Sequence, residues 1–168
     1  MNIVMVSPGW PPEHFANGIV SSVSQFYEAY IEMGHSPQIV TANLVGDASS
    51  VNVHDCIKKT GIWIRLKSKV LWRIGIPYRL MQPIVDSIRI KATELYRRGK
   101  ADVIEIEESW GSALHLLGHL PIPVVVRLHG PWFLNGKAKG MDRIDSNYKY
   151  RVRLEGKAIS SANGISAP

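Results

Sequence analysis

Short apolar runs of strand type alternate with longer amphipathic segments along the chain, and this alternation constrains the fold more than any other feature. Strands are predicted at residues 3–6, 38–42, 62–66, 103–106, 124–128 and 164–167, with a further short one at 51–54. Apolar residues at helical spacing predict helices over 19–34, 78–98, 112–117 and 142–160. Because strands joined through helices pair in parallel with right-handed crossovers, we expect a three-layer Rossmann-like α/β domain with a mainly parallel sheet.

Two local signals refine this expectation. Pro83 is placed to start or kink the helix over 78–98, since proline lacks the backbone N–H of a helix interior. Glycines at 130, 136 and 140 predict a loop that leads to the last helix.

Composition limits the class of protein. Of the 168 residues 45% are hydrophobic and 20% are charged, which is ordinary for a globular domain. No stretch reaches the roughly 18 apolar residues of a membrane span, and the first residues lack the pattern of a signal peptide. Cys56 is the single cysteine, so a disulfide framework and a thiol metal site are excluded. We expect a cytoplasmic protein.

The net charge of +6 is unevenly distributed. Residues 1–57 contain no Lys or Arg and carry −5, residues 58–100 carry +10, and residues 101–168 carry +1. A basic block of this kind commonly faces an anionic partner, although solvated helix faces explain it equally well. No nucleic-acid motif accompanies the block, so an anionic membrane surface is the favoured partner and nucleic acid is not expected.

The first predicted strand runs into a Pro- and Gly-punctuated loop that ends at Asn17 and Gly18, where the first helix begins. Free backbone N–H groups and the helix dipole attract anions at such a place. A glycine there also allows a phosphate to approach closely, while the alternative is a glycine that serves only the turn. Asn17 precedes it and tolerates a positive φ.

Polar side chains also follow two later strands. His129 comes directly after the most apolar predicted strand, where an imidazole can hydrogen-bond a sugar hydroxyl, or simply cap the loop. Glu105 and Glu107 alternate with isoleucines and therefore share one face of their strand. Such a pair can bind hydroxyl groups or act in paired-carboxylate hydrolysis.

Four segments in order resemble the N-terminal half of family 4 retaining glycosyltransferases of the GT-B fold. They are the opening strand with its Pro11-Pro12 and Asn17-Gly18 loop, Asp102–Glu107 with Trp110-Gly111, the strand and exit loop at 125–131, and the closing segment at 162–168. In the closing segment Asn163 stands where that family has Asp. The resemblance implies that residues 1–168 form one domain of a longer enzyme, whose nucleotide-sugar-binding C-terminal domain is absent from this chain and without which the chain is inactive.

The same resemblance assigns roles. Asn17 and Gly18 would face the diphosphate of a nucleotide-sugar donor, and His129 would lie against the donor sugar as the catalytic residue. Glu107, Trp110 and Gly130 would bind a carbohydrate or lipid-linked acceptor. No metal and no cofactor is implied. These roles require the ends of the first and fifth strands to converge as half of a cleft. The alternative is a stand-alone anion- or membrane-binding module that uses residues 58–100.

Overall fold

The computed structural model describes residues 1–46, 52–57, 78–140 and 146–167, with residues 78–81 as backbone only. The strands are β1 (Asn2–Ser7), β2 (Ser36–Thr41), β3 (Val53–Asp55), β4 (Val103–Glu107), β5 (Val124–Arg127) and β6 (Gly164–Ser166). The helices are η1 (Pro12–His14), α1 (Gly18–Glu32), α3 (Tyr78–Arg97), η2 (Ser109–His115), α4 (Trp132–Ala138) and α5 (Ser146–Ser161).

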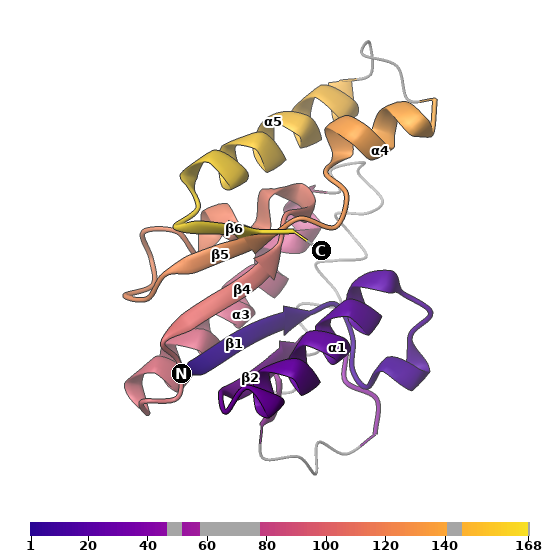
Figure 1. Cartoon of the computed structure of the whole chain (residues 1–168). Helices are drawn as coiled ribbons and strands as arrows, with labels where there is room; N and C mark the ends of the chain where they lie inside the picture. The colour runs from indigo at the N-terminus through magenta and orange to yellow at the C-terminus, as the bar shows by residue number, and fades with distance from the viewer. Residues whose placement is uncertain (47–51, 58–77, 141–145, 168) are drawn as a thin grey trace.

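In the described part of the chain these strands form one sheet in the order β3-β2-β1-β4-β5-β6, and every pair is parallel. The prediction of a mainly parallel α/β domain is therefore confirmed (Figure 1). The chain moves from β1 outward to β2 and β3, and returns to the other side of β1 with β4. Sheets of this kind bind ligands beyond the carboxyl ends of the strands where the order reverses. Here that point lies between β1 and β4.

Strand alternation separates two cores. Val4 and Val6 of β1 join one cluster with Ile104 and Ile106 of β4, beneath α3. The β1 residues on the opposite face, Ile3 and Met5, join a second cluster with Val23 of α1. Helix α1 and helix α3 therefore cover opposite faces of the sheet, which gives the three layers (Figure 1).

The predicted boundaries of several elements differ from the structure. Pro83 lies inside α3, where its carbonyl accepts a hydrogen bond from Ser87 Oγ at 2.9 Å, and does not begin the helix. The short strand expected at 51–54 is β3, Val53–Asp55. The strand expected at 62–66 lies outside the described residues.

The region after β4 departs most from prediction. The helix expected at 112–117 is the η2 turn from Ser109 to His115, which is interrupted by Trp110 and Gly111 at φ of 56° and 67°. The predicted loop over 130–140 was wrong, because α4 occupies Trp132–Ala138. A seven-residue helix containing a glycine is too short for its periodicity to be read from sequence.

Candidate functional site at the carboxyl edge of the sheet

The carboxyl ends of β1, β4 and β5 meet at a small hollow beside the start of α1. Its walls include Ile19 of α1, Val6 of β1, Glu107 of β4 and His129 after β5. The volume is about 10 Å³, which is room for a single water molecule. The structure thus brings the first turn of α1 and His129 together, as the predicted convergence of strand ends requires.

A much larger cavity of about 380 Å³ lies on the α3 side of the same edge. Eight of its twelve lining residues are apolar. They come from β1, β4 and α3, from the residues just after β1 and β2, and from Ile57. Val6, Ile106 and Glu107 line both this cavity and the small hollow. Glu107 therefore lies between the space beside His129 and a cavity large enough for a small organic ligand.

The carboxyl group of Glu107 holds its proton unusually strongly. Its pKa is raised from 4.5 to about 7, mainly because the group is buried and to a smaller extent because of the nearby charge of Glu108. A hydrogen bond from Ser109 Oγ, 3.2 Å from Oε2, opposes the rise. Both protonation states are populated at neutral pH. Glu107 can therefore either accept a hydrogen bond from a ligand hydroxyl or donate one.

The side chain of Glu105 lies on the same face of β4 as that of Glu107, but in a different environment. Arg127 Nη2 lies 2.6 Å from both of its carboxylate oxygens, and the Tyr30 hydroxyl donates to it at 3.3 Å. The guanidinium also stacks on the Phe26 ring, 3.6 Å from its centroid. Because Arg127 neutralises Glu105, the two glutamates do not form a like pair, and the hydrolytic interpretation loses its second free carboxylate.

Glu108 fixes the loop that carries His129. Its two oxygens accept hydrogen bonds from the backbone N–H groups of His129 and Gly130, at 2.9 and 3.0 Å, and its side chain is only 3% exposed. Gly130 has φ of 145°, and a Cβ there would overlap the Asn135 amide. Gly130 is thus required by loop geometry. The role of Glu108 was not predicted from the sequence. The available signal was strand alternation, which puts Glu108 and Glu107 on opposite faces and so gives them different neighbours.

The imidazole of His129 is half-buried, and burial lowers its pKa, while the charge of Glu108 acts in the opposite direction. The side chain is therefore neutral at physiological pH. A neutral imidazole offers one donor and one acceptor nitrogen to a ligand.

Asn17 and Gly18 form the start of α1. Asn17 Oδ1 accepts a hydrogen bond from the Ile19 N–H at 2.9 Å, so Asn17 is the N-cap. Its φ of −141° is extended, so the tolerance of asparagine for a positive φ is not used at this position. A Cβ on the exposed Gly18 would meet nothing within 4 Å. The fold therefore leaves open space at this helix terminus and does not itself require a glycine.

Trp110 and Glu107 line different cavities. It lines a separate cavity of about 200 Å³ between η2, α3 and α5, which shares only Val85 and Ser112 with the larger cavity. The Arg151 guanidinium lies between the rings of Trp110 and Trp132, at 4.6 and 4.0 Å from their centroids. The structure therefore does not bring Trp110 and Gly130 into the Glu107 cavity.

Another buried carboxylate, that of Glu155, fixes this region. It is completely buried and accepts hydrogen bonds from the backbone N–H groups of Trp110 and Trp132 and from Arg151 Nε. These contacts join η2, α4 and α5. Two of the donors are backbone N–H groups that only the fold brings together, so no sequence pattern predicts these contacts.

Much of the basic block lies outside the described residues. Glu94 of α3 pairs with Lys91 and with Arg98, which follows the end of the helix, and Asp86 pairs with Arg89. These pairs reduce the local positive charge. In the part of the chain that the structure describes, no helix is long and apolar enough to cross a membrane. The same residues contain no cluster of three or more His, Cys, Asp or Glu side chains suited to a metal ion. Membrane-surface binding remains a prediction.

No protein-family model matches this sequence, and no curated protein matches it either.

Proposed function

We propose that this chain is the acceptor-binding half of a retaining glycosyltransferase that uses a nucleotide-sugar donor. The observation that carries the proposal is the meeting of three groups at one edge of the sheet: the open helix start at Gly18, the neutral imidazole of His129, and the proton-holding carboxyl of Glu107. The ordered resemblance to family 4 glycosyltransferases supports the same function.

Each group has a role that its environment suits. The N–H groups at the start of α1 and the helix dipole stabilise the donor diphosphate. His129, held by Glu108, donates a hydrogen bond to the donor sugar. Glu107 binds the acceptor hydroxyl, since it can accept the hydroxyl proton in a hydrogen bond. As in the family that the chain resembles, the remaining nucleotide-sugar contacts belong to a second domain.

The test uses the product of the complete reading frame. Purified protein is incubated with a panel of UDP-, GDP- and ADP-sugars, and nucleoside diphosphate release and the anomeric configuration of the product are measured. We expect release with one donor, retention of configuration, and a loss of roughly 100-fold in kcat/KM in His129→Ala. The control is His119→Ala, which alters an exposed histidine. Equal activity of these two variants would contradict the proposal.

A further inference from the structure

We propose that the 380 Å³ cavity binds the apolar body of an amphiphilic alcohol whose hydroxyl group lies at Glu107, and that this class of molecule is the acceptor. The assignment of the alcohol as an acceptor rests on the proposed function. The binding site itself rests only on the cavity and its lining residues.

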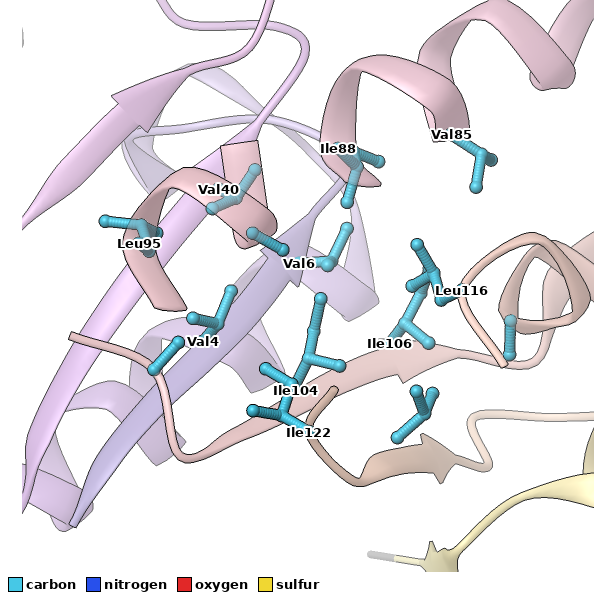
Figure 2. Packing of buried hydrophobic residues seen from close by; sticks show 14 of the residues in the cluster. Val4, Val6, Val40, Val85, Ile88, Leu95, Ile104, Ile106, Leu116 and Ile122 are labelled. Carbon is cyan, nitrogen blue, oxygen red and sulfur yellow. The ribbon is translucent and has the colours of Figure 1, made fainter. Parts of the chain in front are cut away.

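The wall of the cavity is an open extension of the hydrophobic core. Val85 and Ile88 of α3 are 1% and 5% exposed, and Ile106 of β4 is 3% exposed. Figure 2 shows Val85 and Ile88 facing Val6 and Ile106 of the sheet across this side of the molecule. A ligand here buries its own apolar surface against residues of the hydrophobic core, and burial of apolar surface favours binding.

Among the described residues the cavity wall has four polar side chains, those of Ser7, Asn43, Glu107 and Ser112, and both serine hydroxyls are engaged. Ser7 Oγ donates to the Gly9 carbonyl at 2.6 Å, and Ser112 Oγ donates to the Ser109 carbonyl at 2.8 Å. A sugar carries several hydroxyls, and each one left unpaired on burial weakens binding. An alcohol with a single hydroxyl needs one strong partner, and Glu107 provides it.

The position of Glu107 determines the orientation in which the alcohol binds. Because Glu107 also lines the hollow that contains His129, a hydroxyl hydrogen-bonded to it lies at the boundary of the two spaces. The apolar body then extends away from His129 toward Ile84 and Ile88 of α3. This arrangement places the reactive oxygen toward the donor side and the inert part of the molecule in the cavity.

The experiment measures binding by the 168-residue chain and needs no enzymatic activity. Geraniol serves as the amphiphilic alcohol and lactose as the polar comparator. Methyl NMR of isoleucine-labelled protein should show geraniol-dependent shifts for Ile84, Ile88 and Ile106, and none with lactose. Ala42→Phe, which fills the cavity from the end of β2, should weaken geraniol binding at least roughly 10-fold.

Ala138→Phe adds the same side chain at an exposed position of α4 and should leave the affinity unchanged. Thermal melting checks that each variant is folded. If Ala42→Phe does not fold, Ile84→Asn, which puts a polar group in the half-buried wall, should give the same weakening.

Two results would overturn the inference: wild-type affinity for geraniol in a folded cavity variant, or lactose shifting the same methyl groups with similar affinity. The outcome also separates the two proposals. Sugar transfer to lactose without geraniol binding would refute the apolar acceptor and keep the transferase. Geraniol binding without nucleoside diphosphate release in the complete protein would refute the transferase and keep the cavity as a binding site.

Discussion

Glu105 and Glu107 lie two residues apart on one face of β4, yet they differ in what compensates their charge. Arg127 neutralises Glu105 inside the sheet layer, whereas Glu107 receives one hydrogen bond from Ser109 at the strand end. Strand alternation predicts their shared facing, but not this difference, because Arg127 arrives from β5. The chemistry available at the edge depends on that difference.

Ionisation of Glu107 should make the stability of the protein depend on pH. Burial raises the pKa of this carboxyl from 4.5 to about 7, so between these pH values the folded state binds more protons than the unfolded chain. Stability therefore falls as pH rises through this window, by about 3 kcal/mol in total. Glutamine does not ionise, so the free energy of unfolding of Glu107→Gln should rise relative to that of wild type between pH 4.5 and 7. Urea denaturation measures this difference.

Glu32→Gln supplies the control, because Glu32 is exposed at the end of α1. A constant difference for Glu107→Gln at pH 4.5 and pH 8 would show that this carboxyl titrates normally.

Glu105 and Arg127 should show strong energetic coupling. Removal of one partner leaves a buried charge without compensation, so Glu105→Leu and Arg127→Met should each cost about 3 kcal/mol or more. The double variant leaves no buried charge and should cost less than either single one. Chemical denaturation of all four proteins measures the coupling. The half-buried pair of Lys91 and Glu94 on the surface of α3 should give less than about 1 kcal/mol in the same cycle. Additivity of the buried pair would contradict this account.

Helices and strands in which apolar residues recur at regular spacing could be predicted from the sequence. Short elements that tertiary contacts fix could not. Apolar spacing located α1, α3 and the buried strands to within a few residues. Helix α4 and the η2 turn were not predicted, because both are short and are fixed by hydrogen bonds from the backbone N–H groups of Trp110 and Trp132 to Glu155. Glu155 appears in the sequence only as a charged residue, without any sign of these partners.

The close approach of η2 and α5 gives a prediction at this scale. Gly111 and Gly118 have nearly the same φ, 67° and 73°, so alanine carries the same backbone penalty of about 1 kcal/mol at both positions. A Cβ at Gly111 would lie 2.7 Å from the Leu154 carbonyl oxygen, whereas at Gly118 it would meet nothing within 4 Å. Gly111→Ala should therefore cost about 2 kcal/mol more than Gly118→Ala in urea denaturation. Equal costs would mean that η2 and α5 separate readily.

For the whole molecule, the sequence predicted parallel strands but not their order. The reversal between β1 and β4 pairs segments about a hundred residues apart, as in the hydrogen bond from the Asn2 N–H to Asp102. That contact lies at the amino edge of the sheet, while Gly18, Glu107 and His129 lie at the carboxyl edge. The domain therefore separates a stabilising edge from a candidate ligand-binding edge.

This separation predicts opposite effects for two substitutions. Asp102→Ala removes hydrogen bonds from the Asn2 backbone and side chain, so it should cost about 1 kcal/mol of stability and leave the KM for the nucleotide sugar unchanged. Gly18→Ala should keep stability or raise it by about 0.5 kcal/mol, because the helix start has room for the methyl group. It should nevertheless raise that KM at least roughly 5-fold, since the methyl group stands where the diphosphate approaches. Denaturation and steady-state kinetics on the complete protein measure both effects, and an unchanged KM in Gly18→Ala would remove the start of α1 from the donor site.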